Sequence, residues 1–210
     1  MLQGQGELGR AISESALVDK ISFTGSVPTG QKILRASAEH VRPVTLELGG
    51  KSPLVVFDDF DEDTAVQGEY QSLCIKLNVL GILQANFYSQ GQVCSNGTRV
   101  YLHEDVYESI KSKLIDALDK IKVGDPLEDS TRFGALVSKS HLEKVEGYVN
   151  RALSEGGKVV SHSRAIDTKL DGYYMRPVLM ECHDDMEITR EEHFGPICQI
   201  YKFRQFHNFI

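Results

Sequence analysis

The segment KISFTGSVPTGQKILRASAEHVRPVTLELGG, residues 20–50, has the pattern of a strand, a helix and a second strand. Residues 20–25 read as a short buried strand, and residues 27–40 have helical spacing with Pro28 near their start. Residues 41–50 are β-rich and end in a glycine pair, where backbone can approach a ligand closely. The segment therefore predicts a unit of α/β architecture.

The remainder of the chain continues this alternation. SPLVVF (52–57) and KVV (158–160) read as strands, and residues 105–123 carry apolar side chains on one helical face. Ser140 and Glu143 have the spacing of a capping box and predict the start of another helix, with Leu142, Val145, Val149 and Leu153 facing the core. Helices that alternate with short apolar strands predict an α/β fold.

Composition excludes several function classes. The 210 residues carry a net charge of -7 with acids and bases interspersed, so no basic footprint for nucleic acid or an anionic membrane is present. No apolar run reaches the length of a membrane span, and the N-terminus lacks the features of a signal peptide. We expect a cytoplasmic protein that acts on a small molecule.

The four cysteines contain no CxxC pair, and the seven histidines show no HxxxH spacing, so we expect reduced thiols and no metal site. Cys94 differs from the others because it lies in SQGQVCSNGTR (89–99), among small polar residues. It reads either as a nucleophile or as a small buried hydrophobic residue. Arg99 follows Cys94 by five residues, and we expect it to hold this loop in place rather than to bind a substrate.

Three other motifs could carry chemistry. Glu47, between two leucines, is either a general base whose pKa is raised by apolar surroundings or a residue on the exposed face of a strand. Glu191 and Glu192 precede HFGP and could equally lie in a solvated loop. GQGELG (4–9) matches a dinucleotide fingerprint, but almost no strand can precede it, so a turn before a helix is the simpler interpretation.

Four segments taken in order resemble the NAD(P)-dependent aldehyde dehydrogenase superfamily. They are FTGSVPTG (23–30), VTLELGGKSP (44–53), FYSQGQVCSNGTR (87–99) and EEHFGPI (191–197). The CxNGTRV form of the third segment and DGYYMRP (171–177) are most similar to the branch of betaine-aldehyde and 4-trimethylaminobutyraldehyde dehydrogenases. That branch oxidises aldehydes that carry an amine or a quaternary ammonium group.

The resemblance implies roles for individual residues. Cys94 would attack the aldehyde, and Glu47 would deprotonate the water that hydrolyses the resulting thioester. Gly25, Ser26 and Gly30 would lie near the pyrophosphate of NAD.

The nicotinamide end of the cofactor would meet a second set of residues. Gly49 would let the backbone pass close to the nicotinamide, while Glu192 and Phe194 would hold its ribose. Tyr88 would offer an aromatic face to a quaternary ammonium substrate. NAD is the cofactor that the branch implies, and a full-length relative would be a homo-oligomer.

The resemblance also divides the chain. Residues 1–48 would be the end of a Rossmann-type NAD-binding domain, 49–203 most of an α/β catalytic domain, and 204–210 a tail outside the family pattern. Residues 69–81 have the character of an insert in the helix before Cys94. They would loop out, displace Cys94 by rotating the helix, or simply lengthen it.

Three functions remain open at this point. The first is NAD-dependent oxidation of a small aldehyde. The second is a cysteine hydrolase that works without a cofactor, which would need a histidine base near Cys94. The third is a shortened, inactive relative of the enzyme, which large exposed apolar surfaces would favour.

Overall fold

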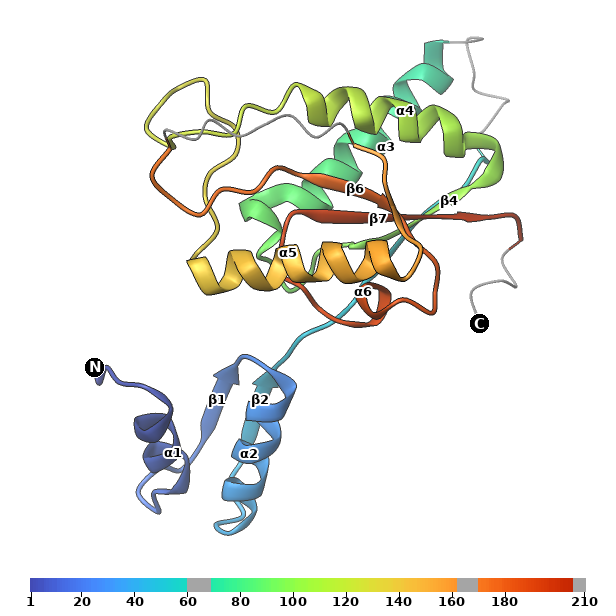
Figure 1. Ribbon diagram of the computed structural model, residues 1–210. Helices are drawn as coiled ribbons and strands as arrows, with labels where there is room; N and C mark the ends of the chain where they lie inside the picture. Colours follow the sequence, from blue (N-terminus) through green and yellow to red (C-terminus); the bar gives the residue numbers. More distant parts are fainter. Residues whose placement is uncertain (60–68, 162–169, 206–210) are drawn as a thin grey trace. The chain divides into compact units, whose positions relative to one another are not determined.

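The computed structural model describes residues 1–59, 69–161 and 170–205, of which residues 69–77 are described by their backbone only. The chain divides into two compact units, Met1–Gly50 and Lys51–Ile210 (Figure 1). We refer to them as the N-terminal and the C-terminal unit. Each unit has its own sheet.

The N-terminal unit has two helices beside a two-stranded parallel sheet. Its elements are α1 (Gly6–Glu14), β1 (Ile21–Thr24), α2 (Val27–Ala38) and β2 (Val44–Glu47). Ile21 pairs with Val44 at one end of the sheet and Thr24 with Glu47 at the other. Pro28 lies in the first turn of α2, where its missing N–H costs nothing. The strand–helix–strand prediction for residues 20–50 is confirmed.

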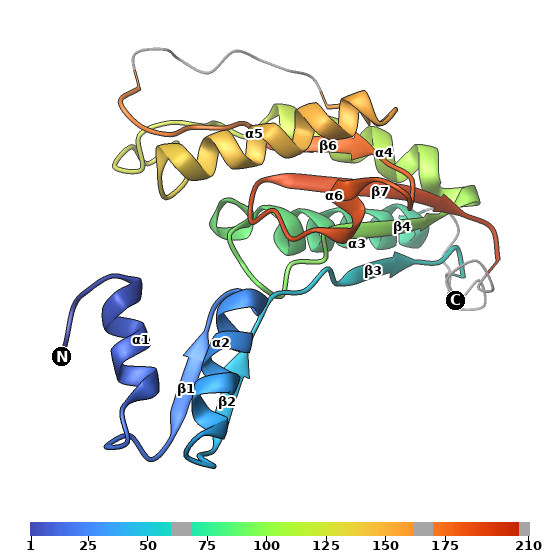
Figure 2. The same ribbon diagram turned by 60° about the horizontal axis from the view of Figure 1, so that its bottom comes forward.

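The C-terminal unit is built on a five-stranded sheet in the order β3-β4-β7-β6-β5. Its strands are β3 (Pro53–Val56), β4 (Arg99–His103), β5 (Lys158–Val159), β6 (Val178–Glu181) and β7 (Ile197–Phe203). All neighbours are parallel except β5, which runs antiparallel to β6. The four parallel strands point the same way in Figure 2, and the predicted α/β fold is confirmed.

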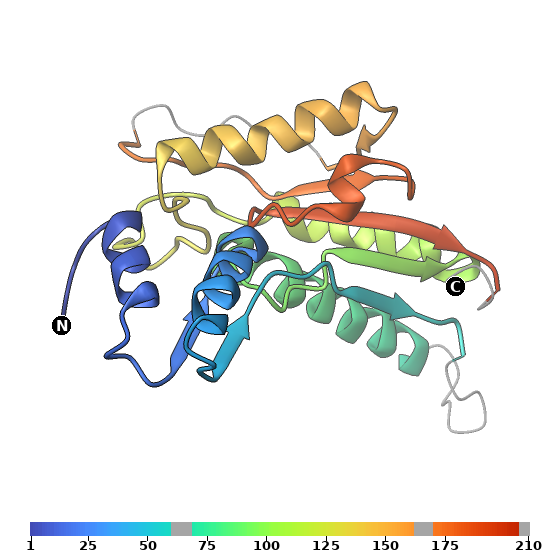
Figure 3. The ribbon, with the colours of Figure 1, turned by 90° about the horizontal axis from the view of Figure 1, so that it is seen from below.

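Helices cover both faces of this sheet, which can be followed in Figure 3. They are α3 (Glu69–Phe87), the short 3-10 helix η2 (Tyr88–Gly91), α4 (Glu104–Asp119), α5 (Lys139–Ser154) and α6 (Glu187–Arg190). The described end of α3 and the inner face of α4 join one apolar cluster with Leu179 and Ile200 of the sheet. The helices α5 and α6 join a second cluster with Met180 and Ile197. Successive sheet residues alternate between the two clusters because strand side chains alternate between faces.

Two details of the predicted helices are wrong. The N-cap of α5 is Ser138 rather than Ser140, because Ser138 has extended backbone angles and its Oγ accepts a hydrogen bond from the backbone N–H of His141 at 3.2 Å. Leu153 is 45% exposed instead of facing the core, and Ala152 beside it is fully buried. In addition to these two, helix α4 ends at Asp119, four residues before the end of the predicted helix at residue 123.

Helix α3 runs without a break from Glu69 to Phe87, so residues 69–81 are helical and do not loop out. The burial of Val79, Ile82 and Phe87 at helical spacing gives its described end one core-facing side. The continuous helix excludes looping out, and the other two alternatives, displacement of Cys94 and a simple lengthening of the helix, both fit it.

The end of the chain was predicted to lie outside the family pattern, and no membrane span was predicted. Most of the segment 204–210 lies outside the described residues, although Arg204 bonds to Glu104 at the start of α4. No helix in the described part combines the length and the apolar character that crossing a bilayer requires.

Candidate active site

Cys94 lies in the loop that leads from α3 into β4. The chain leaves the helix through Ser89 and Gln90, which both have left-handed backbone angles, and through Gly91 at φ +75°. The backbone N–H of Gly97 then bonds to the carbonyl oxygen of Ala85 at 3.1 Å and ties the far end of the loop to α3. Cys94 itself is exposed, so it is not the buried small hydrophobic residue of the alternative reading.

The other cysteine thiols differ from Cys94. Burial raises the pKa of Cys182 to about 12 and raises the pKa of Cys198, which is fully buried, even further. Both thiols therefore stay protonated at neutral pH and are poor nucleophiles. Among Cys94, Cys182 and Cys198, Cys94 is exposed, Cys182 is half-buried and Cys198 is buried.

The segment EEHFGP forms a second loop between α6 and β7. Glu191 is exposed and Glu192 half-buried, whereas His193 is fully buried, so the solvated-loop reading holds only for the first residue. Phe194 has a left-handed φ of 52°, and its carbonyl oxygen lies 2.6 Å from Nε2 of His141 on α5.

The two loops are packed directly against each other at two glycines. A Cβ added to Gly91 would lie 2.2 Å from the carbonyl oxygen of Gly195, and a Cβ added to Gly195 would lie 2.3 Å from Val145. Neither position has room for a side chain. The structure thus brings the loop of Cys94 and the loop of Glu192 and Phe194 together, although about a hundred residues separate them in sequence.

Lys51 and Arg99 are the charged residues beside this pair of loops. The guanidinium of Arg99 donates from Nε to the carbonyl oxygen of Lys51 at 2.8 Å, so it holds the segment that precedes β3, whereas the sequence predicted that it holds the loop of Cys94. Burial lowers the pKa of Lys51 to about 7, while the nearby charge of Glu192 acts in the opposite direction. Sequence reasoning missed Lys51, whose only signal was its place after the glycine pair.

The remaining candidate residues lie in the N-terminal unit, at the carboxyl ends of its two parallel strands. The backbone N–H of Gly25 donates to the carbonyl oxygen of Glu47 at 3.0 Å and holds the two strand ends together. The side chain of Glu47 and the backbone of Gly49 are both exposed. Within the N-terminal unit Glu47 lies on the exposed face of its strand.

Helix α2 starts next to these strand ends. Ser26 is its N-cap, but its Oγ bonds to the hydroxyl of Thr29 at 3.0 Å rather than to a backbone N–H. The first N–H groups of α2 thus have no capping side chain, which leaves them available to an anion. Gly30 is buried against Leu48 and Leu46, so its observed role is to let α2 pack on β2.

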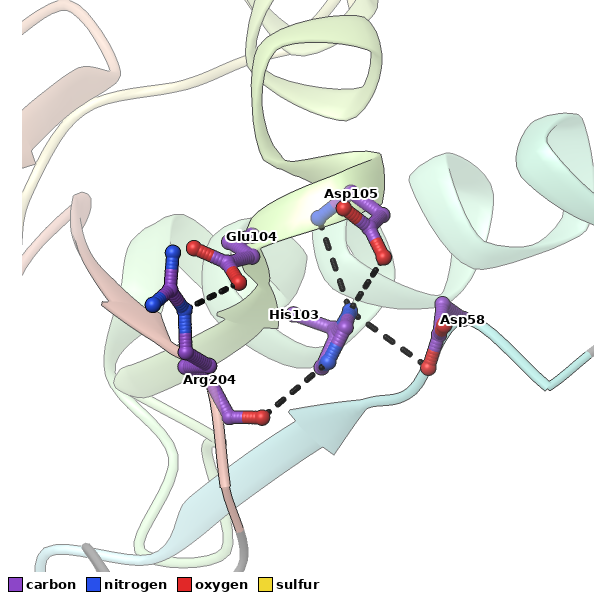
Figure 4. Close-up of polar contacts among 5 residues, drawn as sticks. All are labelled: Asp58, His103, Glu104, Asp105 and Arg204. Atoms are coloured by element: carbon purple, nitrogen blue, oxygen red, sulfur yellow. Dashed lines mark hydrogen bonds and ion pairs between the residues drawn. The ribbon is translucent and has the colours of Figure 1, made fainter.

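A third polar cluster lies where β3, β4 and β7 end (Figure 4). Within the described ranges it is the one group of His, Cys, Asp and Glu side chains close enough to surround a metal ion. Nδ1 of His103 lies 3.4 Å from Asp58 and 3.6 Å from Asp105. That nitrogen also accepts from the backbone N–H of Asp105, and Nε2 contacts the carbonyl oxygen of Arg204. Because both ring nitrogens are engaged and both carboxylates exposed, we interpret His103 as the cap of α4.

Comparison with known proteins agrees with the motifs. The model of the aldehyde dehydrogenase family matches residues 1–210. A 4-trimethylaminobutyraldehyde dehydrogenase of Oryzias latipes is 46% identical over 208 residues, which are 97% of this chain and 39% of that protein. The chain therefore spans well under half the length of the relative it matches.

Solved structures give the same result. An NAD+ complex of an aldehyde dehydrogenase from Bacillus cereus is 36% identical with a TM-score of 0.83, over 95% of this chain and 38% of that one. A betaine aldehyde dehydrogenase from Staphylococcus aureus, solved with NAD+, is 32% identical with a TM-score of 0.83, over 94% and 38%. The chain belongs to the aldehyde dehydrogenase family.

Proposed function

We propose that this chain is part of an enzyme that oxidises a small aldehyde to the carboxylic acid with NAD. The observation that carries the proposal is the packing of the loop of Cys94 against the loop of Glu192 and Phe194. A thiol nucleophile and the residues that would hold the nicotinamide ribose are thereby brought to one place. In this proposal residues 1–48 end the NAD-binding domain and residues 49–203 form most of the catalytic domain.

The residues present fit a bound dinucleotide. The uncapped start of α2, with Gly25 and Ser26, would receive the pyrophosphate, and Gly30 would keep that helix close to β2. Gly49 has no side chain to obstruct the nicotinamide, whose ribose Glu192 and Phe194 would hold. When bound, NAD supplies the acceptor for hydride.

The chemical steps then belong to two side chains. The Cys94 thiolate attacks the carbonyl carbon and forms a thiohemiacetal, and loss of hydride from that carbon leaves a thioester on Sγ. Glu47 takes a proton from water, the resulting hydroxide attacks the thioester, and the carboxylic acid leaves as Sγ is released.

The substrate we propose carries an amine or trimethylammonium group. The similarity to 4-trimethylaminobutyraldehyde and betaine aldehyde dehydrogenases supports this choice. Tyr88, which is 63% exposed and begins the turn toward Cys94, offers an aromatic face for such a cation. We further propose that the complete protein is a cytoplasmic homo-oligomer.

The test is formation of NADH, followed by absorbance, in the natural protein supplied with 4-trimethylaminobutyraldehyde. Cys94→Ser should abolish NADH formation, while the matched variant Cys182→Ser should retain it. Glu47→Gln should give a single burst of about one NADH per site and little turnover after it, because the thioester forms but is not hydrolysed. Full turnover by Cys94→Ser would refute the proposal.

The same assay separates this function from a cysteine hydrolase. Both enzymes would cleave an ester through Cys94, so ester hydrolysis does not distinguish them. Aldehyde consumption that strictly requires NAD identifies the dehydrogenase, and ester hydrolysis without any aldehyde consumption in the presence of NAD identifies the hydrolase.

A second candidate applies to the 210-residue chain by itself, which we propose to be inactive alone. The supporting observation is the exposed apolar surface of the N-terminal unit, at Ile12, Leu17, Val27, Leu34 and Val41. Turnover by the isolated chain at the rate of the natural protein would contradict this second candidate.

A further inference from the structure

His193 sits at the end of a buried polar chain in the C-terminal unit. Its Nδ1 accepts a hydrogen bond from the backbone N–H of Gly195 at 3.1 Å. Its Nε2 lies 3.2 Å from the side-chain amide of Gln199, and the far end of that amide is 3.0 Å from the hydroxyl of Tyr201. The same hydroxyl is 2.7 Å from Oγ1 of Thr189. All four side chains are buried.

This arrangement defines the protonation of the ring. Burial lowers the pKa of His193 well below its usual value, and the charges of Lys51, Lys144 and His141 lower it further. The ring is therefore neutral at physiological pH. Because Nδ1 accepts from Gly195, the single proton is on Nε2. The structure has the amide nitrogen of Gln199 facing that ring nitrogen, and we assign the amide the opposite orientation, with its oxygen accepting the ring proton and its nitrogen toward Tyr201.

The hydrogen bond to Gly195 acts on a strained turn. Phe194, the preceding residue, is not a glycine yet has a φ of 52°, a strained conformation that persists only where its surroundings enforce it. His193 holds the turn from the Gly195 N–H, and His141 contacts it at the carbonyl oxygen of Phe194. Two histidines thus hold the backbone around Phe194, one at its carbonyl oxygen and one at the next N–H group.

We propose that His193 is a positioning residue for the cofactor: its buried ring fixes the turn at Phe194 and Gly195 so that Glu192 and Phe194 meet the nicotinamide ribose. The proposal rests on the proposed function, because it assumes that these two residues bind NAD. His193 itself is enclosed by protein and touches neither substrate nor cofactor. A histidine that only filled the core would affect stability and leave NAD binding in the folded enzyme unchanged.

The experiment compares His193→Leu with His193→Gln in the natural protein. The leucine removes the ring contacts to Gly195 and Gln199. It should raise the KM for NAD about tenfold or more, because Glu192 and Phe194 would no longer be held in position for the ribose. The glutamine keeps a polar end toward Gln199 and should restore the KM to within about threefold of wild type. His183→Gln, a change at an exposed histidine near α6, is the matched control and should leave KM as it is.

Cofactor-independent ester hydrolysis by Cys94 reports whether each variant is folded and keeps its nucleophile. It should stay within about threefold of wild type in all three variants, because the loop of Cys94 keeps its own bond from Gly97 to Ala85. If His193→Leu does not fold, Tyr201→Phe interrupts the same chain at its far end and should raise the KM for NAD by about threefold.

The outcomes are distinct. An unchanged KM for NAD in a folded His193→Leu or Tyr201→Phe enzyme, with wild-type oxidation intact, overturns the role of His193 and leaves the proposed function standing. Absence of NAD binding and of NADH formation in the wild-type natural protein overturns both. A raised KM with ester hydrolysis preserved and rescue by glutamine is the result we expect.

Discussion

The two units contain the same kind of strand and helix but differ in how deeply they bury them. In the C-terminal unit, β7 is buried at every residue but Lys202, because the sheet is covered on both faces. In the N-terminal unit, β1 and β2 alternate between half-buried and exposed residues, and α1 buries none. A two-stranded sheet is marginal by itself, and only a wider sheet has an interior.

This difference matters because candidate residues lie in each of the two units. The C-terminal unit, with its deeply buried sheet, contains Cys94, Glu192 and Phe194. The N-terminal unit, with its partly exposed sheet, contains Glu47 and Ser26. We therefore expect substitutions in the C-terminal unit to cost more stability than matched substitutions in the N-terminal unit.

The largest contrast should come from truncating one apolar side chain in each unit. Leu179→Ala should lower the free energy of unfolding by about 3–4 kcal/mol, because Leu179 is fully buried in β6 and a cavity would remain. Ile33→Ala on α2 should cost about 2 kcal/mol or less, since its neighbours are exposed enough to close in. Urea unfolding followed by circular dichroism measures both, and equal losses would contradict the comparison.

A pair of glycine substitutions should give the next largest effect. Gly91→Ala should cost about 2 kcal/mol, because alanine is strained at φ +75° and its Cβ would strike Gly195. Gly50→Ala should stay within about 0.5 kcal/mol, since nothing lies near its added Cβ. The same unfolding assay applies, and the rate of ester hydrolysis should fall for Gly91→Ala alone. If Gly91→Ala changed neither stability nor ester hydrolysis, the loop of Cys94 and the loop of Glu192 and Phe194 would be able to separate freely.

The third contrast is the response of the C-terminal unit to pH. Burial holds the pKa of His193 below that of the unfolded chain, which is about 6.5. Between about pH 6.5 and the lower folded-state pKa, the unfolded chain binds a proton that the folded chain does not, so stability falls as pH falls. His193→Gln should reduce this loss when unfolding is compared at pH 7 and pH 5. An identical loss in the variant and the wild type would contradict a buried neutral ring.

The smallest contrast involves the two serine N-caps. Ser138→Ala at α5 should cost about 1 kcal/mol, because the hydroxyl accepts from the backbone of His141. Ser26→Ala at α2 should cost only about 0.3 kcal/mol, because its hydroxyl bonds to Thr29 and not to the helix backbone. Thermal unfolding resolves the first, and a comparable loss at Ser26 would show that it caps α2 in solution.

Local patterns explain which parts of the fold were predictable. The strand–helix–strand of residues 20–50 follows from apolar spacing and Pro28, which act within a few residues. The prediction of the α5 N-cap was wrong because Ser138 and Ser140 both have a hydroxyl that can cap a helix, and only backbone geometry distinguishes them. Residues 69–81 lie within α3, although looping out was one of the three structures that the sequence left open.

The site was less predictable because its contacts are distant in sequence. EEHFGP is polar and gave no sign that His193 would be buried, which happens because Gln199 and Tyr201 of β7 meet it inside the fold. The packing of Gly91 on Gly195 has no local signal either. The roles of Cys94 and Glu47 were inferred from motifs and remain predictions.

The position of β7 has a consequence for synthesis of the chain. This strand lies in the middle of the five-stranded sheet, between β4 and β6, yet both of these neighbours precede it in the sequence and are therefore synthesised first. Until residues 197–203 emerge, β4 and β6 each present an unpaired edge, which invites association with other chains. The five-stranded sheet thus joins its two edges only after residues 197–203 are made, and a chaperone that shields those edges would act within that interval.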